Sequence, residues 1–351
     1  MNVLFCELLY PRTHARSNSF YINCLAELDL SLFVMAPNNF YSIQNASVKL
    51  LPIEELHRKK GRISYRINEL KYMKQIINAV KKNKIDKIIL ASSDYAMLPF
   101  LLFRLPKRIE CYLVHHAELD VLETNKIKRI IFDTFRNKIH HLVFEPFIAD
   151  FLKHDLKIDN SRVHIMPHSL NQNVSFSANG EFCCDLAGLS NSNDEKFIED
   201  LIKMEQQTGK LKAIGKKVIL KSNQFEFDDD YLKVFRGHLP DEEYNMLISG
   251  ARRIFMPFEK NFGYRESGTL MDALSNGKYV IASDIPLMQN YIRQYPTLCS
   301  IYHTTGDVIS IISDDTFDNS KVDEETAGFI AAHSAEQYKQ CMSNILKTEE
   351  L

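Results

Sequence analysis

The first half of the chain alternates short apolar runs with longer stretches whose apolar residues recur every three or four positions. The runs predict β-strands over residues 2–9, 30–35, 48–52, 87–92, 110–115, 141–145 and 162–166. The longer stretches predict helices, most clearly over residues 67–82, 95–103, 127–135 and 148–156. Strands that alternate with helices indicate βαβ units around a parallel sheet.

A polar segment rich in Asn, Ser and Gly, residues 167–181, interrupts this pattern and is typical of a linker. The alternation then resumes. We expect strands over 182–189, 217–221, 231–235, 254–256 and 279–282, and helices over 194–203, over 240–249 and from about Ser267. A last helical stretch covers 327–346. We therefore predict an N-terminal domain of residues 1–170, a C-terminal domain of residues 171–326, and a terminal helix within 327–351 that either stays with the second domain or crosses back to the first.

Length and composition agree with two domains inside the cell. The chain has 351 residues, of which 45% are hydrophobic, which is more than one core usually holds. No apolar run reaches the roughly 18 residues that a membrane span needs, and the apolar opening has no basic leader. The seven cysteines include no Cys-x-x-Cys pair, so we interpret them as reduced thiols. We expect a cytoplasmic protein.

The net charge of −2 hides an asymmetry, because residues 1–170 carry +8 and residues 171–351 carry −10. Much of the positive excess lies in 58–87, a basic amphipathic helix whose predicted apolar side comprises Ile67, Leu70, Ile76, Ile77 and Val80. Such a face either meets an anionic membrane or a phosphorylated acceptor, or is simply solvated. Nucleic acid is disfavoured because aromatic residues are not interleaved with the basic ones.

The most informative segment is 256–284, where a strand, a polar loop and a helix that opens at Ser267 follow one another. The first N–H groups of a helix lack partners and lie at its positive end, so phosphate oxygens bind there. Gly268 and Thr269 supply such groups, and glycine lets a ligand approach the backbone closely. The alternative is that Ser267 acts only as an N-cap, but a position after a strand of an α/β domain favours a phosphate site.

Two charged residues extend this segment. Arg265 directly precedes the helix, and its planar guanidinium suits phosphate oxygens, although it would equally serve as a surface cation. Asp272, one turn into the helix, is within reach of a ribose hydroxyl. These residues together predict a phosphate-binding site with a ribose contact beside it.

Residues 160–290 resemble the C-terminal donor-binding domain of bacterial GT-B glycosyltransferases, above all the retaining family 4 type. The resemblance is carried by His238-Leu-Pro-Asp-Glu-Glu-Tyr244, Phe258, Arg265-Glu-Ser-Gly268, Asp272-Ala-Leu274, 277–284, 162–170 and Gly188-Leu-Ser190. It implies an α/β protein of two Rossmann-like, doubly wound parallel-sheet domains with an interdomain cleft. It also implies a nucleotide-diphosphate sugar as donor and retention at the anomeric carbon.

In that family two glutamates eight positions apart hold the donor sugar and the ribose. The second falls on Asp272, but the first falls on Tyr264, so the resemblance assigns the sugar to Glu266, two residues later. The family's loop arginine is also missing from 188–196. We expect Lys221 and Arg265 to supply this charge and Arg236 to lie near the base, with no cofactor and no metal.

Other residues are weaker candidates. His116 and Glu118 end a first-domain strand, where they either contact the sugar and activate an acceptor hydroxyl or are only hydrogen-bonded. The turn 10–19 lacks the glycines of a dinucleotide site, which argues against NAD. It carries five residues expected to border the cleft or to cap a plain loop: Arg12, His14, Arg16, Ser17 and Asn18.

Two further motifs are interpreted as structural. His168 at the linker is expected to hold the turn, and Asp228-Asp-Asp230 resembles the metal motif of the other glycosyltransferase fold but is expected to be a surface loop.

The leading hypothesis is a metal-independent glycosyltransferase that acts on a glycan or lipid-linked acceptor of the cell-surface polysaccharide or lipopolysaccharide type, at the inner membrane face. The alternatives are a non-catalytic nucleotide-sugar-binding scaffold and a GT-B-type sugar-nucleotide epimerase.

Overall fold

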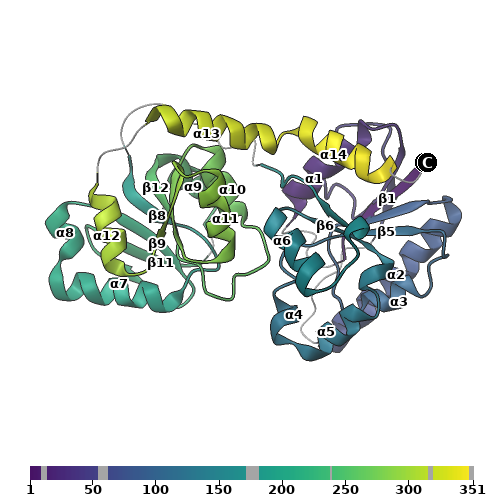
Figure 1. The fold of residues 1–351 in the computed structure, drawn as a ribbon, viewed down its shortest axis with the longest axis horizontal. Coiled ribbons are helices and arrows are strands. Elements are labelled where there is room, and N and C mark those ends of the chain that lie inside the picture. The colour runs from purple at the N-terminus through teal and green to yellow at the C-terminus, as the bar shows by residue number, and fades with distance from the viewer. Residues whose placement is uncertain (9–13, 54–61, 171–181, 238, 315–318, 348–351) are drawn as a thin grey trace. The chain divides into compact units, whose positions relative to one another are not determined.

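A computed structural model describes residues 1–8, 14–53, 62–170, 182–237, 239–314 and 319–347, except for the side chains of 62–65 and 319–321. The chain forms two compact units (Figure 1). Unit 1 comprises residues 1–169 and 333–351, and unit 2 comprises residues 170–332. The predicted linker residues 171–181 lie outside the described residues.

Unit 1 contains a seven-stranded, fully parallel sheet in the order β3-β2-β1-β4-β5-β6-β7. Its strands are β1 (Asn2–Cys6), β2 (Ser31–Ala36), β3 (Lys49–Pro52), β4 (Lys87–Leu90), β5 (Glu110–Val114), β6 (His140–Val143) and β7 (Val163–Ile165). All seven predicted strands are confirmed. They form because helices cover both faces of the sheet, so nearly continuous apolar runs are buried.

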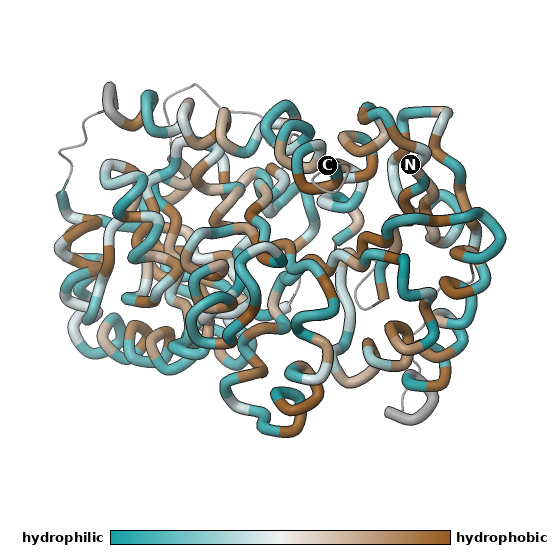
Figure 2. Tube along the Cα trace, turned by 45° about the vertical axis from the view of Figure 1, so that its right-hand side comes forward, coloured by the Kyte–Doolittle hydropathy of each residue, from teal (hydrophilic) through white to brown (hydrophobic). Residues whose placement is uncertain are grey.

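The helices of unit 1 are α1 (Ala15–Ala26), α2 (Arg62–Lys82), α3 (Leu98–Leu102), α4 (Val121–Thr124), α5 (Lys126–Asp133), α6 (Pro146–Asp150) and α14 (Ala335–Lys347). Figure 2 shows hydrophilic and hydrophobic residues alternating along much of the chain. The helix predicted over 148–156 is α6 followed by a π-helical turn, Phe151–Asp155.

The predicted apolar side of α2 is partly wrong. Ile76, Ile77 and Val80 are buried, but Ile67 is 49% exposed and Leu70 is 43% exposed. The side of α2 that packs on the core carries Glu69, Tyr72 and Met73 in this stretch, so Ile67 and Leu70 lie on a side of the helix that faces solvent.

Unit 2 contains a second sheet, in the order β10-β11-β9-β8-β12-β13-β14, in which β10 alone pairs antiparallel. Its strands are β8 (Cys184–Gly188), β9 (Val218–Ser222), β10 (Phe227–Asp228), β11 (Leu232–Arg236), β12 (Ala251–Met256), β13 (Tyr279–Ser283) and β14 (Cys299–Tyr302). The sequence analysis predicts five of them and misses the two-residue β10 and β14.

The helices of unit 2 are α7 (Glu195–Thr208), α8 (Lys210–Ile214), α9 (Asp241–Gly250), α10 (Gly268–Ser275), α11 (Pro286–Gln294), α12 (Thr305–Ser313) and α13 (Asn319–Ala332). Asp194 caps α7, because its Oδ1 accepts hydrogen bonds from the backbone N–H groups of Lys196 and Phe197 at 3.0 and 3.3 Å. The helix ends at Gly209, whose φ of 56° lies in the left-handed region that glycine tolerates.

The strand order reverses between β1 and β4 in unit 1 and between β8 and β12 in unit 2. In doubly wound sheets, ligands bind beyond the carboxyl ends of the strands at this point. At the end of β8 the packing is close, since a Cβ on Gly188 would lie 2.8 Å from Leu220 Cδ2 and 3.3 Å from the Phe255 carbonyl oxygen. Gly188 is therefore a packing residue.

The single helix predicted over 327–346 is interrupted. α13 ends at Ala332 within unit 2, and α14 begins at Ala335 and packs on α1 in unit 1. Tyr338 stacks on Tyr21 with ring centroids 4.9 Å apart, and Lys87 Nζ donates to the Leu346 carbonyl oxygen at 2.7 Å. The break follows from packing, because the two helices bury their apolar residues in different cores.

Candidate functional site

The N-terminus of α10 presents free backbone donors at the carboxyl edge of the unit 2 sheet. Ser267 caps the helix, since its Oγ accepts a hydrogen bond from Leu270 N at 3.3 Å. Gly268 and Thr269 occupy the first two helical positions, where an α-helix provides no acceptor for the N–H groups. A Cβ on Gly268 would meet no atom within 4 Å, so the start of the helix is uncrowded on the side of this residue.

The two residues before this helix are held beside its start. Glu266 Oε1 accepts a hydrogen bond from Ser267 N at 2.9 Å, and Tyr291 donates to Glu266 Oε2 at 3.0 Å. The guanidinium of Arg265 lies over the Phe262 ring, 4.2 Å from its centroid. Arg265 and Glu266 therefore lie next to the N–H groups at the start of the helix, as expected for residues adjacent in sequence.

Asp272 lies one turn into α10 and is only 9% exposed. Its Oδ2 accepts a hydrogen bond from the Tyr244 hydroxyl of α9 at 2.8 Å. Asp272, the residue predicted to bind the ribose, is therefore already hydrogen-bonded to a tyrosine, and this contact joins α9 to α10. A ligand hydroxyl that reaches Asp272 would meet a phenol beside the carboxylate.

The loops after β8 and β12 are joined at the switch point of the second sheet, because Asn193 and Phe258 form an antiparallel bridge. Asn193 Nδ2 also donates to the Lys221 carbonyl oxygen at 2.7 Å, and Lys221 Nζ donates to Asn191 Oδ1. Burial lowers the pKa of Lys221. The Lys221 ammonium therefore lies against the loop after β8. This is the loop that lacks the arginine expected from the family resemblance.

Arg236 is the last residue of β11 and is exposed. It pairs in register with Ser222 of β9, the residue after Lys221. The two predicted basic residues thus end neighbouring strands.

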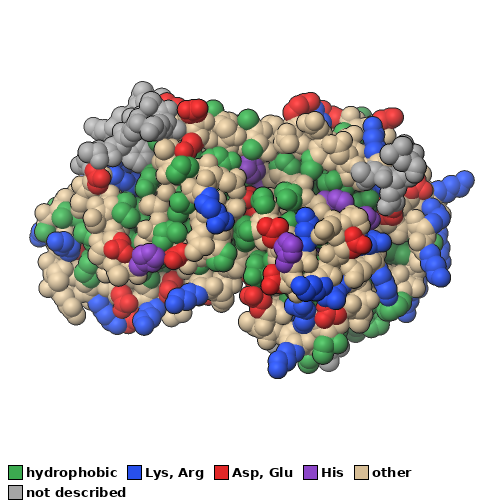
Figure 3. Space-filling view, viewed as in Figure 1, with side chains coloured by type: hydrophobic (Ala, Val, Ile, Leu, Met, Phe, Trp, Pro, Cys, Tyr) green, Lys and Arg blue, Asp and Glu red, His purple; other side chains and the backbone are tan. Residues whose placement is uncertain are grey.

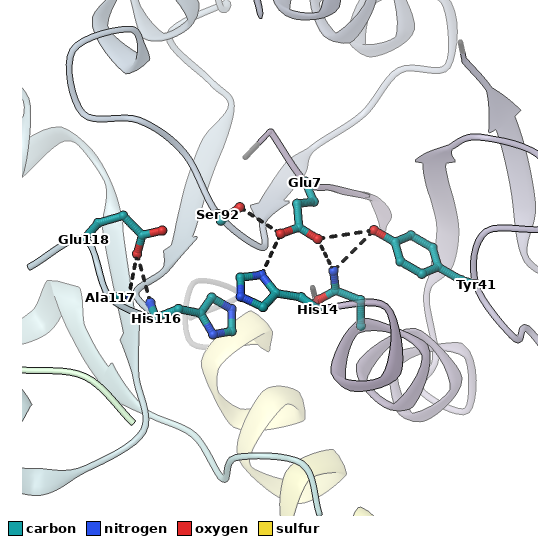
Figure 4. A network of polar contacts seen from close by, with 8 residues as sticks. Glu7, His14, Tyr41, Ser92, His116, Ala117 and Glu118 are labelled. Atoms are coloured by element: carbon teal, nitrogen blue, oxygen red, sulfur yellow. Dashed lines mark hydrogen bonds and ion pairs between the residues drawn. The ribbon is translucent and has the colours of Figure 1, made fainter. Parts of the chain in front are cut away.

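In unit 1, the carboxylate of Glu7 lies at the switch point, directly after β1 (Figure 4). Its side chain is 1% exposed. It accepts hydrogen bonds from Ser92 Oγ at 2.9 Å, from Asn18 Nδ2 and from the Tyr41 hydroxyl at 3.5 Å, and its Oε1 lies 2.7 Å from His14 Nδ1. Sequence reasoning named His14 and Asn18 but missed Glu7. The available signal was a carboxylate immediately after a buried strand.

His116 stacks on His14 with ring centroids 4.0 Å apart (Figure 4). One of its ring nitrogens donates to the Ala91 carbonyl oxygen. Its Nε2 is buried and has no partner among the described residues. Burial, followed by the neighbouring His14 and His168, lowers the pKa of His116 well below its usual value. The ring is therefore neutral near pH 7, with Nδ1 protonated and the Nε2 lone pair open to a donor.

Glu118 has a more local role. Its Oε2 accepts hydrogen bonds from the backbone N–H groups of His116 and Ala117, both at 3.0 Å. Burial raises the pKa of Glu118. The carboxylate holds the turn that carries His116.

Of the remaining predicted residues, Arg12 lies outside the described residues, Arg16 is exposed and Ser17 is half-buried. His168 Nδ1 lies 2.8 Å from the Ser169 carbonyl oxygen, and burial lowers the pKa of His168 to about 4.

The acidic motif of unit 2 is partly in the strand β10, since Asp228 is its last residue, and not wholly in a loop. Asp229 Oδ1 accepts hydrogen bonds from the backbone N–H groups of Tyr231 and Leu232, each at 2.7 Å. The described parts of the chain contain no group of three His, Cys, Asp or Glu residues placed to hold a metal ion.

No family model matches the chain, and no curated protein matches it. Solved structures do. A glycosyltransferase from Rickettsia africae ESF-5 is 12% identical with a TM-score of 0.64, covering 99% of each chain. WaaG, a glycosyltransferase involved in lipopolysaccharide biosynthesis, is 10% identical with a TM-score of 0.60, covering 98% of this chain and 99% of its own.

A third similar structure is the UDP-GlcNAc 2-epimerase from Methanocaldococcus jannaschii, which is 13% identical with a TM-score of 0.56 and covers 99% of this chain and 100% of its own. The chain has the GT-B fold. The predicted fold class, two doubly wound parallel-sheet domains, is confirmed. At such low identity the likeness concerns the fold, so the activity has to be argued from the residues of this GT-B chain.

Proposed function

We propose that this GT-B chain is a glycosyltransferase that moves a sugar from a nucleotide-diphosphate sugar to a glycan or glycolipid acceptor. The observation that carries the proposal is the start of α10, where two backbone N–H groups without an intrahelical acceptor lie beside an uncrowded glycine at the carboxyl edge of a Rossmann-like sheet. Enzymes and binding proteins share this fold, so the site, and not the fold, supports the assignment.

The chemistry asks the protein to bind a diphosphate and to stabilise its developing charge as the glycosidic bond breaks. The N–H groups of Gly268 and Thr269 would donate hydrogen bonds to phosphate oxygens, and Arg265 and Lys221 would add positive charge without a metal ion. Asp272 would take a ribose hydroxyl, and Glu266 a hydroxyl of the donor sugar. Arg236 would lie near the base.

On unit 1, we assign His116 to a hydroxyl group of a substrate. Its buried Nε2 lone pair has no partner among the described residues, and a buried acceptor without a donor is costly unless a ligand supplies one. Glu118 would position the His116 turn. The resemblance of residues 160–290 to the retaining family supports retention at the anomeric carbon, which NMR of the product anomer would test.

The acceptor would be of the cell-surface polysaccharide or lipopolysaccharide type, in the cytoplasm at the inner membrane face. The similarity to WaaG supports this class.

Gly268→Asp tests the donor site. The new carboxylate adds negative charge beside the helix N–H groups and is expected to weaken UDP or GDP binding about 100-fold by repelling the diphosphate. The fold should be retained, because the space is open and an acidic first turn stabilises a helix. Isothermal titration calorimetry measures the affinity.

Gly306→Asp is the matched control, because Gly306 lies in the first turn of another helix of unit 2, α12. It should leave nucleotide binding unchanged. Unaltered binding by Gly268→Asp, or no binding of either nucleotide by the wild type, would contradict the assignment.

His116→Phe tests the hydroxyl contact. The phenyl ring preserves the stack on His14 but lacks the Nε2 lone pair, so transfer is expected to slow about 100-fold while nucleotide affinity stays the same. The rate of sugar transfer from the donor that binds, measured with a panel of glycan and lipid-linked acceptors, decides this. An unchanged rate argues that His116 is structural.

An epimerase is the second candidate, since one similar structure is a UDP-GlcNAc 2-epimerase. NMR of UDP-GlcNAc incubated with the protein and no acceptor would show inversion at C2. A binding scaffold would bind nucleotide sugar and neither hydrolyse nor transfer it.

A further inference from the structure

An unusual concentration of exposed apolar side chains lies on one part of unit 1. The described residues include twelve large hydrophobic side chains that are exposed, and six of them lie on α2, α3 and α5 or directly follow α3. These six are Ile67, Leu70, Phe100, Phe103, Ile127 and Ile130. Phe103, which directly follows α3, is 74% exposed, and Ile127 and Ile130 are 72% and 66% exposed. Single exposed apolar residues are ordinary, but a group of six needs a physical reason.

Specific contacts tie the three helices together. Asp94, just before α3, accepts Arg66 Nη2 of α2 at 2.6 Å and lies 3.8 Å from Lys128 Nζ of α5. Lys138 Nζ lies 5.0 Å from the centroid of the Phe103 ring. These contacts hold the three helices beside one another, and we term their exposed apolar and basic side chains, with those of the residues that directly follow α3 and α5, the apolar–basic face.

The same helices and the residues that directly follow them carry exposed basic side chains. These include Lys71, Lys74, Arg104, Lys107, Lys126 and Lys138. The exposed acid Asp133 lies 3.4 Å from Arg129 and 3.0 Å from Arg136, so cations accompany it. Figure 3 shows blue Lys and Arg side chains beside green hydrophobic ones in the lower part of unit 1, where Figure 1 draws α3 and α5.

The orientation of α5 leaves two isoleucines in solvent. Asn125 caps this helix through a hydrogen bond from Lys128 N at 3.0 Å, and Phe132 is its buried anchor in the core. Ile127 and Ile130, three positions apart, share the opposite, solvent-facing side. An apolar helix side flanked by lysines fits the interface between lipid headgroups and acyl chains.

We propose that the apolar–basic face binds the surface of an anionic lipid bilayer, with its isoleucines and phenylalanines in the headgroup region and its lysines on lipid phosphates. Charge complementarity selects this partner, because a purely apolar protein contact would not require neighbouring cations. Among the described residues, no helix is both long and apolar enough to cross a membrane. The contact would be peripheral, and it does not depend on the proposed transferase activity.

The sequence-based prediction placed a membrane contact on the basic stretch 58–87 alone. In the structure, most of the exposed apolar side chains lie on α5 and on or next to α3, and α2 contributes Ile67 and Leu70. Part of the predicted stretch, residues 58–61, lies outside the described residues.

Vesicle sedimentation tests the proposal. The full chain should bind vesicles of phosphatidylglycerol and phosphatidylcholine, and bind pure phosphatidylcholine vesicles far more weakly. The double variant Ile127→Asp/Ile130→Asp should lose about ten-fold or more of this binding, because two apolar contacts are replaced by negative charges. Lys126→Gln should cost about five-fold, which corresponds to about 1 kcal/mol per basic residue, and added salt should weaken binding.

Met246→Asp is the matched control, because Met246 is 60% exposed and lies on α9 of unit 2. It should bind vesicles like the wild type. Circular dichroism should show that all variants are folded, as expected for exposed positions.

Three results would overturn the proposal: no binding of the wild type to phosphatidylglycerol vesicles at low salt, equal binding to neutral vesicles, or equal loss in the Met246→Asp control. Self-association of the wild type that Ile127→Asp/Ile130→Asp abolishes, without vesicle binding, would instead identify a second copy of the chain as the occupant.

Discussion

Lowering the pH from 6.5 to 4 is expected to remove about 3 kcal/mol or more of the stability of this protein, because several histidines are buried in their neutral form. His141 is the clearest case, since it is fully buried and burial lowers its pKa to about 4. Its Nε2 lies 2.7 Å from the Arg136 carbonyl oxygen, its Nδ1 lies 2.8 Å from His115 Nε2, and His115 Nδ1 lies 2.7 Å from the Tyr95 hydroxyl.

The geometry assigns every proton in this chain of hydrogen bonds. A carbonyl oxygen only accepts, so His141 carries its proton on Nε2 and its Nδ1 accepts from His115 Nε2–H. His115 Nδ1 then accepts from the Tyr95 hydroxyl. A second proton on either ring would point an N–H at another donor, so protonation and this chain of hydrogen bonds exclude each other.

The sign of the pH effect follows from linkage. The pKa of His141 is about 4 in the folded protein, below the ordinary value of about 6.5 that it has when unfolded. Between these values the unfolded chain binds the proton and the folded chain does not, so stability is complete above pH 6.5 and falls as the pH falls. A shift of about 2.5 units corresponds to about 3 kcal/mol for one such histidine.

Urea unfolding followed by circular dichroism between pH 7 and pH 4 measures this effect. The double variant His115→Phe/His141→Phe should be less stable at pH 7, because Tyr95 and Arg136 lose partners, but its stability should vary less with pH. His303→Gln, at an exposed position, should reproduce the wild-type profile. A wild-type stability that does not change from pH 7 to pH 4 would rule out this account.

Glu7→Ala is expected to destabilise the protein by about 3 to 5 kcal/mol, the cost of removing one member of a buried, hydrogen-bonded charge network. Ser92, Asn18, Tyr41 and His14 all contact this carboxylate, and truncation leaves their polar atoms in a site that excludes water. Glu7→Gln keeps the shape and one acceptor oxygen, so it should cost less than Glu7→Ala. Chemical denaturation at pH 7 measures both.

Glu27→Ala is the control for this experiment. Glu27 also accepts a hydrogen bond from a partner, Lys339 of α14 at 2.8 Å, but its side chain is 58% exposed. An exposed ion pair contributes about 1 kcal/mol or less, so the change should be small. If Glu7→Ala were no more destabilising than Glu27→Ala, the buried network would not contribute to the free energy of unfolding.

Local sequence signals account for much of the fold. The apolar runs predict all seven strands of the first sheet, and Asp194 and Ser267 mark the starts of α7 and α10 because capping involves only neighbouring residues. The prediction fails where a signal is short or ambiguous. The strand β14, Cys-Ser-Ile-Tyr, mixes polar and apolar residues. Ile67 and Leu70 have the spacing of a buried helix side, but the side of α2 that they occupy is exposed.

The candidate site divides in the same way. Arg265, Glu266, Ser267, Gly268 and Thr269 are consecutive, so the sequence alone brought them together at the start of one helix. The pairing of Asp272 with Tyr244 and the position of Lys221 against Asn191 depend on the packing of separate elements. Sequence reasoning proposed the first set as a unit and listed Asp272 and Lys221 without their partners.

By itself, the sequence determined the α/β class, the two stretches of alternating strands and helices and the phosphate-type helix start, because each follows from the residue pattern of single strands or helical turns. Only the tertiary structure brought Glu7, His14 and His116 together, aligned His115 with His141, and docked α14 on α1. These contacts depend on the order in which strands pair across a sheet. Hydrophobic periodicity reports which side of an element is buried, but carries no information about which distant element covers it.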